Sequence, residues 1–344
     1  MFGAEGDIRF ERIGKAGVIT LTRPQALNAV SHAMVLAITR AADAWACDDS
    51  IALVIIKAEG RAFSAGGDIQ AIYEAGRAGQ PLFGFFADEY RLNAAIRLYP
   101  KPWVALVDGL VMGGGVGVSF HGSHRVMTEK AVFAMPETGI GFFPDVGASY
   151  FLSRLTGHMG MYLGLTGARL KAEAAAACGL ASHVAVSAAL PQLFATLCET
   201  GNTASLSELA IYDGVADESA AKIAHHYSAP ALGEMFAGLQ KSADTGDEWA
   251  AGQLAILAKR CPLSLAVAFR QISAGAVQTV QDCLKMEFRI VSRMLIGHDF
   301  YEGIRAAVID KDGAPHWSHR SVQDVADTEA DAYFAPLGQE ELDL

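Results

Sequence analysis

The sequence predicts an α/β fold followed by a helical C-terminal region. Up to about residue 185, short β-branched apolar runs alternate with glycine turns and helical patterns, which is the order typical of α/β proteins. Beyond that point strand patterns fade, and Ala, Leu and polar residues recur at helical spacing. We therefore expect an α/β core over residues 1–185, and a helical region of the same functional unit over residues 186–344.

The expected elements follow one another without a low-complexity linker. Ser31 is a candidate N-cap, because its hydroxyl can accept a hydrogen bond from the first turn of a helix. In the core we expect strands over 8–12, 18–21, 52–58 and 104–107, and helices over 31–46, 69–76 and 84–98. In the C-terminal region we expect helices over 187–200, 218–243, 247–258, 263–275 and 279–296.

The composition narrows the class of protein. Among 344 residues, 51% are apolar, which argues against disorder, and 27 basic against 38 acidic residues give a net charge of -11. An acidic chain without a Lys/Arg block predicts no nucleic-acid and no membrane partner. The five cysteines include no C-x-x-C pair, so we expect neither disulfides nor a metal site. The first residues lack the basic and apolar segments of a targeting peptide, which favours a cytoplasmic protein.

Two glycine-rich loops are the strongest local signals. The first is Phe63-Ser-Ala-Gly-Gly-Asp68, and the second is Gly113-Gly-Gly115, which follows an apolar strand. Glycine lets the backbone approach a ligand closely, and N–H groups at the start of a helix are free to bind it. Two such N–H groups that converge form an oxyanion hole. Either loop alone is also typical of a structural turn, so neither identifies a function by itself.

The pair of loops, about forty-five residues apart, resembles the crotonase (enoyl-CoA hydratase/isomerase) superfamily. The resemblance implies a spiral of β-β-α units and an acyl-CoA thioester as ligand, with CoA as part of the substrate and no separate cofactor. It also implies that the N–H groups of Gly67 and Gly114 hold the thioester oxygen. Ser64, Ala65 and Asp68 are the implied substrate contacts on the first loop.

One branch of the superfamily matches further segments. The resemblance implies that hydratases carry one glutamate two residues after the triple glycine and a second about twenty residues later, and here these positions are Gly117 and Glu137. Half of that pair is therefore absent. The segments 89–93, 135–147 and 299–306 resemble the 3-hydroxyisobutyryl-CoA hydrolase branch instead.

In that branch the functional positions correspond to Glu89, Gly114, Glu137 and Asp145. The resemblance implies that Glu137 acts as a general base on water or as a nucleophile through a transient anhydride. Asp145 would orient the reacting groups or give them a proton. Glu89 would accept a hydrogen bond from the substrate hydroxyl. Each has a structural alternative: Glu137 as a first-turn helix acid, Asp145 as an N-cap, and Glu89 as a solvated helix residue.

Three functions remain open from the sequence. The first is hydrolysis of 3-hydroxyisobutyryl-CoA, a step of valine catabolism. The second is a hydratase or isomerase on another acyl-CoA, against which Gly117 counts, and the third is a non-catalytic acyl-CoA-binding protein, against which the full set of glycines and carboxylates counts. The resemblance also raises a homo-oligomer, a trimer or a hexamer, as an alternative to a monomer.

Overall fold

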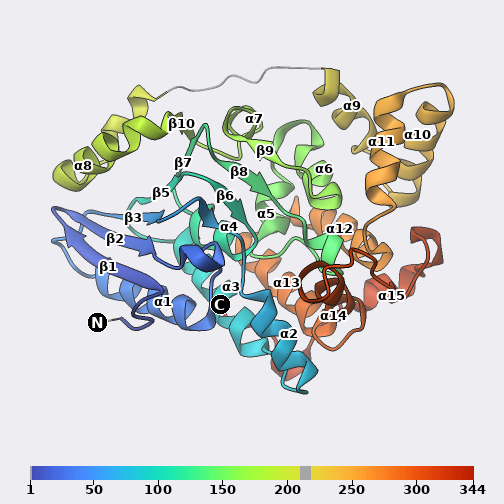
Figure 1. The fold of residues 1–344 in the computed structure, drawn as a ribbon, viewed down its shortest axis with the longest axis horizontal. Coiled ribbons are helices and arrows are strands. Elements are labelled where there is room, and N and C mark those ends of the chain that lie inside the picture. Colours follow the sequence, from blue (N-terminus) through green and yellow to red (C-terminus); the bar gives the residue numbers. More distant parts are fainter. Residues whose placement is uncertain (1, 210–217) are drawn as a thin grey trace.

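The computed structural model describes residues 2–209 and 218–344, which fold around two β-sheets (Figure 1). The strands span Ile8–Ile13 (β1), Ala16–Leu21 (β2), Leu53–Ala58 (β3), Ala62–Ser64 (β4), Trp103–Val107 (β5), Leu110–Met112 (β6), His124–Thr128 (β7), Val132–Ala134 (β8), Leu170–Lys171 (β9) and His183–Ala185 (β10). Within the described residues, a 6-stranded sheet has the order β1-β2-β3-β5-β7-β10, and a 4-stranded sheet has the order β4-β6-β8-β9. The β1–β2 and β8–β9 pairs are antiparallel, and the other neighbouring strands are parallel.

The strand order explains how the chain builds a spiral. From β3, β5 and β7 in the larger sheet, the chain turns directly into β4, β6 and β8 of the smaller sheet, and a helix follows each pair. The residues of β2 and β5 are buried at every position, as expected for parallel strands covered on both faces. The repeated strand–strand–helix unit confirms the predicted α/β class and the spiral of β-β-α units.

Helices cover the sheets and form most of the second half of the chain. They span His32–Ala46 (α1), Ile69–Arg77 (α2), Phe83–Arg97 (α3), Gly114–Ser119 (α4), Ala148–Leu152 (α5), Met159–Thr166 (α6), Ala172–Ala177 (α7), Leu190–Thr200 (α8), Glu218–His226 (α9), Leu232–Asp244 (α10), Glu248–Leu257 (α11), Pro262–Gly275 (α12), Val280–Met294 (α13), Asp299–Ile304 (α14) and Asp327–Ala332 (α15). In Figure 1, α10 and α11 lie at the end of the molecule opposite α8 and the strands β1 and β2.

One predicted helix is wrong as a single element. The expected helix over 218–243 is two helices, α9 and α10, and the break between them contains Pro230. Proline lacks the N–H that a helix interior needs, and its ring disfavours helical geometry in the residue before it. Other predictions are confirmed, including the cap of α1 by Ser31.

The C-terminal helices pack directly on the core. α12 packs against α5 and α6, and α13 packs against α3 and α5, within one continuous apolar cluster. The predicted division at residue 185 follows the last strand, β10, and stays a prediction. Among the described helices, none is long and apolar enough to cross a bilayer alone, whereas the pair α11 and α12, bent by 108°, passes that test on length and composition.

Candidate active site

The two glycine loops meet at one point. A β-bridge joins Val30 to the first loop: Val30 N donates to Gly66 O, and Asp68 N donates to Val30 O. The bridge therefore leaves the N–H of Gly67 unused. On the second loop, Gly113 has a φ of 44°, which lets the chain turn from β6 into α4. A Cβ added to Gly114 would lie 3.2 Å from Gly67 N, a tight approach. This geometry fits an oxyanion hole formed by these two N–H groups, whose role stays a prediction.

Glu89, on α3, lies beside these glycines. Only 2% of its surface is exposed, which rules out the solvated-helix alternative. Its Oε1 would lie 2.7 Å from a Cβ on Gly114, and this oxygen has no hydrogen-bond partner among the described residues. Burial, and then the negative charge of Asp145, raise the pKa of Glu89 well above its usual value. The carboxyl group is thus held towards its protonated form, with an oxygen left for a ligand.

Glu137 lies near the same glycines, and it comes from the segment that follows β8. It begins the short 3-10 helix Glu137–Ile140 directly after β8, and it is 6% exposed. Its Oε1 would lie 3.4 Å from a Cβ on Gly113, and its Oε2 has no partner within the described chain. Burial, and then the charge of Asp145, raise its pKa well above the usual value. Its position does match the first-turn alternative, but a helix acid of that kind has no need of a buried, unpaired oxygen.

Asp145 completes a group of three buried carboxyl groups. It is 5% exposed, and the N-cap of the following helix α5 is Gly147, so the alternative of Asp145 as an N-cap is wrong. Tyr90 OH donates to Asp145 Oδ2 at 3.4 Å. Burial raises the pKa of Asp145 to about 7. Carboxyl groups that hold protons near neutral pH are suited to divide acid and base roles.

The loop that carries Asp145 is held by a residue that the sequence did not reveal. Glu287 is fully buried on α13, and the oxygens of its carboxyl group accept hydrogen bonds from Gly147 N at 2.6 Å, Ser149 N at 2.9 Å and Ser149 Oγ at 2.6 Å. Burial raises its pKa to about 8, against the lowering effect of these bonds. Glu287 lies 140 residues along the chain from Gly147, so no local pattern connects the two.

A second contact, from His121, holds the same loop. Val146 has a φ of 53°, a left-handed conformation that β-branched residues rarely adopt. His121 Nε2 lies 2.6 Å from Val146 O. Burial lowers the pKa of His121 to about 4, so the ring is neutral and donates from Nε2 to this carbonyl oxygen. The strained backbone beside Asp145 is therefore fixed by contacts with both His121 and Glu287.

The position of the missing glutamate is crowded by neighbouring side chains. A Cβ on Gly117 would lie 2.8 Å from Asn93 Nδ2 and 3.0 Å from Val146 Cβ. Asn93 is fully buried, and neither end of its amide has a partner among the described residues. It lies four residues after Glu89 on α3, which places both on one face of that helix. This spacing was visible in the sequence, yet the predicted site did not use it.

The other predicted substrate contacts shape the first loop. The hydroxyl of the fully buried Ser64 accepts from the N–H two residues further on at 3.3 Å, and Ala65 N donates to Leu27 O at 2.9 Å. Asp68 caps α2 and pairs with Arg23 at 2.8 Å. These bonds position the loop, and direct contact of the three residues with CoA stays a prediction.

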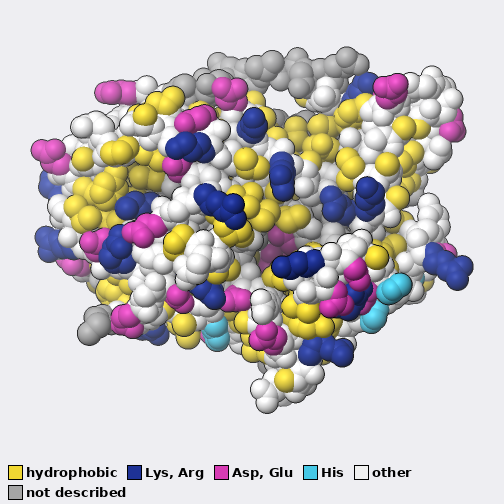
Figure 2. Space-filling view, viewed as in Figure 1, with side chains coloured by type: hydrophobic (Ala, Val, Ile, Leu, Met, Phe, Trp, Pro, Cys, Tyr) yellow, Lys and Arg dark blue, Asp and Glu magenta, His cyan; other side chains and the backbone are white. Residues whose placement is uncertain are grey.

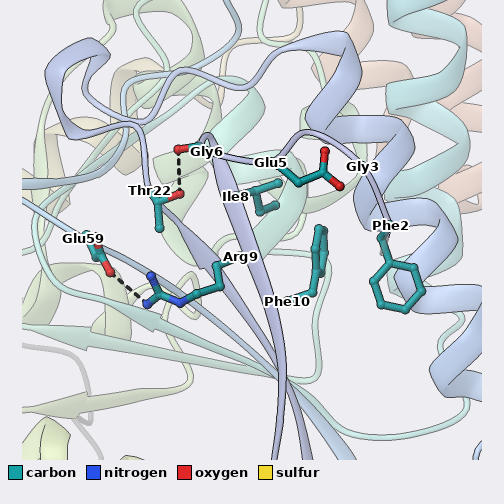
Figure 3. Close-up of a pocket in the computed structure, with 9 residues that line it drawn as sticks. All are labelled: Phe2, Gly3, Glu5, Gly6, Ile8, Arg9, Phe10, Thr22 and Glu59. Carbon is teal, nitrogen blue, oxygen red and sulfur yellow. Dashed lines mark hydrogen bonds and ion pairs between the residues drawn. The ribbon is translucent and has the colours of Figure 1, made fainter.

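The N-terminal segment borders a separate cavity of about 570 Å³ (Figure 3). Figure 3 shows the Arg9 guanidinium turned towards Glu59, and the two pair at 2.9 Å. Phe2 and Phe10 contribute apolar surface. An exposed ion pair beside two rings offers no converging reactive groups, so we assign no chemistry to this cavity. Among residues 2–209 and 218–344, no three His, Cys, Asp or Glu side chains are arranged to hold a metal ion.

Comparison with known proteins identifies the family. A family model described as Enoyl-CoA hydratase/isomerase matches residues 16–334. The chain belongs to this enoyl-CoA hydratase/isomerase family. It is 42% identical over 353 residues to the mitochondrial 3-hydroxyisobutyryl-CoA hydrolase of Gallus gallus, an alignment that covers 98% of this chain and 91% of that relative.

Two solved structures share the fold along their whole length. One is described as an enoyl-CoA hydratase from Rhodobacter sphaeroides 2.4.1, with a TM-score of 0.89, 39% identity, and coverage of 98% of this chain and 100% of that one. The other is described as a carnitinyl-CoA dehydratase from Mycobacterium thermoresistibile, with a TM-score of 0.91, 36% identity, and coverage of 98% of both chains. The names of these relatives differ in the reaction, so the residues of the site have to distinguish hydrolysis from hydration.

Proposed function

We propose that this chain hydrolyses an acyl-CoA thioester, with 3-hydroxyisobutyryl-CoA as substrate and 3-hydroxyisobutyrate and CoA as products. The observation that carries the proposal is the filled space at Gly117 beside an intact Glu137. Hydrolysis needs one base, one water and an oxyanion hole, whereas the hydratase pattern includes a glutamate at the position of Gly117. Vertebrate relatives named 3-hydroxyisobutyryl-CoA hydrolase, at 40–43% identity over nearly the whole chain, support the same substrate.

The reaction divides between backbone and carboxyl groups. Glu137 removes a proton from water while the water oxygen bonds to the thioester carbon, and the N–H groups of Gly67 and Gly114 hold the resulting oxyanion. When the oxyanion collapses, the C–S bond breaks, and Asp145 gives the departing sulfur its proton. The raised pKa of Glu137 means that its ionised form is a stronger base than an ordinary carboxylate, and a pKa of about 7 leaves Asp145 able to donate at neutral pH.

The surface of the molecule agrees with an anionic CoA ligand. Figure 2 shows a hollow near the middle of the face with Lys and Arg side chains around it, although the whole chain has a net charge of -11. Local positive charge of this kind attracts phosphate groups irrespective of the net charge.

Three further statements stay predictions. The sequence favours the cytoplasm, whereas the vertebrate relatives are named as mitochondrial, and fractionation of the native cells would decide the compartment. A role in valine catabolism depends on the proposed substrate. Light scattering of the purified chain would distinguish a monomer from the predicted trimer or hexamer.

A thiol-release assay tests the proposed function. The purified protein is given 3-hydroxyisobutyryl-CoA, and in parallel crotonyl-CoA with the loss of enoyl absorbance as readout. We expect thiol release from the first and no hydration of the second. Hydration without thiol release would contradict the proposal and favour the reaction named for the Rhodobacter sphaeroides structure. Acyl-CoA binding without turnover of either compound would favour the non-catalytic alternative.

A further inference from the structure

A second cavity, of about 170 Å³, lies beside the loop that carries Asp145 and is lined by three arginines. Arg97 ends α3, Arg125 lies in β7, and Arg154 follows α5. His121 also lines the cavity, and its Nε2 bonds to a backbone carbonyl of the Asp145 loop. The cavity is therefore separate from the candidate active site, and the hydrogen bond between His121 and Val146 O connects the two.

None of the three guanidinium groups pairs with a carboxylate of the described residues; their hydrogen bonds run to carbonyl and hydroxyl oxygens. Arg125 donates from Nε and Nη1 to two backbone carbonyl oxygens, at 2.7 and 3.0 Å, and these bonds leave its Nη2 unused. Arg97 and Arg154 lie over the same ring, that of Tyr150, at 5.3 and 3.8 Å from its centre. The positive charges are thus gathered, oriented and not neutralised by the described protein.

The crowding of like charges has an energetic consequence. Burial, and then the charge of Arg97, lower the pKa of Arg125 to about 10. An anion between the guanidinium groups would relieve this repulsion through charge-assisted hydrogen bonds, and the fork-shaped donors of arginine suit tetrahedral oxyanions. The volume is below the roughly 300 Å³ at which pockets for drug-sized ligands begin, so the cavity suits a small anion.

We propose that this cavity is a binding site for a small doubly charged oxyanion of the phosphate type. The phosphate can be free or can be part of a larger molecule such as CoA, and both would be recognised by the same three arginines. The site needs no substrate chemistry, so the proposal is independent of the hydrolase reaction.

Calorimetric titration with inorganic phosphate at low ionic strength tests the proposal. We expect saturable binding to the intact chain, and at least about tenfold weaker binding after Arg97→Gln, because one charge-assisted contact is lost. Arg97 is exposed, so this substitution leaves the fold intact. The matched control is Arg91→Gln, which removes an exposed arginine of the same helix that pairs with Asp88, and it should bind phosphate like the intact chain.

Two outcomes would overturn the phosphate site. One is the absence of saturable heat with the intact chain, and the other is equal binding by Arg97→Gln and Arg91→Gln. A parallel titration with 3′,5′-ADP identifies the source of the phosphate. Loss of its binding in Arg97→Gln would support the site and assign it to CoA, whereas loss for inorganic phosphate alone would support a site for the free ion.

A different observation concerns Asn93 and rests on the proposed function. Its amide is fully buried with both ends unpaired among the described residues, and Glu89, four residues earlier on the same helix face, also has a buried unpaired oxygen. Unpaired polar groups are costly to bury, so we expect a ligand to supply the missing hydrogen bonds. A hydroxyl group both donates and accepts, and it can satisfy an amide and a protonated carboxyl group together.

We infer that Asn93 determines specificity for a hydroxyl on the acyl chain. It acts by pairing with that hydroxyl beside Glu89, and it takes no part in bond breaking. A site built to bond a hydroxyl discriminates strongly against an analogue without one, because the buried polar groups are then left unpaired.

The test compares 3-hydroxyisobutyryl-CoA with isobutyryl-CoA, which differ only in that hydroxyl. We expect the intact chain to prefer the hydroxylated substrate in kcat/KM, and Asn93→Leu, which keeps the volume, to reduce this preference by about 100-fold. An unchanged preference in Asn93→Leu would overturn the role of Asn93. If the intact chain hydrolysed neither compound, the proposed function itself would fail, which is a distinct result.

Discussion

The candidate active site has two halves, one made of backbone N–H groups and the other of carboxyl side chains. One half is backbone: the N–H groups of Gly67 and Gly114, brought so close by strands of the smaller sheet that a Cβ on Gly114 would lie 3.2 Å from Gly67 N. The other half is side chains: Glu89, Glu137 and Asp145, all buried and all with raised pKa values. In the proposed mechanism the backbone half would stabilise a thioester oxyanion whatever the reaction, and the carboxyl half would decide between hydrolysis and hydration.

The two halves also differ in what holds them. The glycine loops are fixed by their own neighbours in the core, such as the bridge to Val30. The Asp145 loop depends on Glu287 from α13. The helical C-terminal region therefore does more than cover the core, because it supplies one of the contacts that hold the Asp145 loop.

Glu137→Gln should give the largest effect. We expect kcat for thioester hydrolysis to fall by about 10²–10⁴, the range for loss of a general base, while the affinity for the CoA ester changes little, because the backbone half is untouched. The measurement is thiol release beside equilibrium binding of a CoA ester. Glu234→Gln, at an exposed position on α10, is the matched control. A Glu137→Gln enzyme with near-normal kcat would remove Glu137 from the mechanism.

Gly114→Ala should break the backbone half while keeping every carboxyl group. The added Cβ would lie 2.7 Å from Glu89 Oε1 and 3.2 Å from Gly67 N, so the oxyanion donors must separate. We expect kcat to fall by about 10²–10³, the range for the loss of one oxyanion donor. Gly84→Ala, where a Cβ meets nothing within 4 Å, is the control and should keep normal activity. Equal activity of the two variants would contradict an oxyanion hole at this place.

The same division explains what could be predicted from the sequence. The glycine loops, the strands β1, β2, β3 and β5 and the longer helices follow from local patterns and were predicted, apart from the helix interrupted at Pro230. The other strands, such as β4, β6 and β8, were not predicted, because they are too short to show a pattern of their own. Glu137 and Asp145 were found through the segment that contains them. The sequence did not reveal why Gly117 carries no side chain, because the atoms that fill its space belong to Asn93 and Val146 on other elements.

Contacts between distant parts of the chain could not be predicted. Glu287 looks like any acidic residue of an amphipathic helix, since its burial depends on how α13 packs on α5. The raised pKa values have the same origin. A carboxyl group in the sequence has no known environment, and the pKa depends on the burial and on the neighbouring charge that the fold supplies.

Asp145→Asn should have a smaller effect on the rate and a clear effect on its pH dependence. A thiol is acidic enough to leave without much help, so we expect kcat at pH 6 to fall only about tenfold. Asp145 is protonated below its pKa of about 7 and charged above it, so the intact enzyme should lose activity as the pH rises through 7. Asp145→Asn should lack this decline. A variant that retains the same decline would show that another group causes it.

Glu287→Gln should show its effect in stability more than in rate. The pKa of Glu287 is about 8 in the folded chain, above its ordinary value of 4.5, so the unfolded chain releases this proton at lower pH. Between these values the folded chain binds more protons, and the free energy of unfolding therefore falls as the pH rises from about 5 to about 8. Glutamine does not titrate, so the variant should lose about 3 kcal/mol less than the intact chain between pH 5.5 and 8.5. Urea unfolding at the two pH values measures the difference, and identical losses would mean that Glu287 stays charged at the loop it holds.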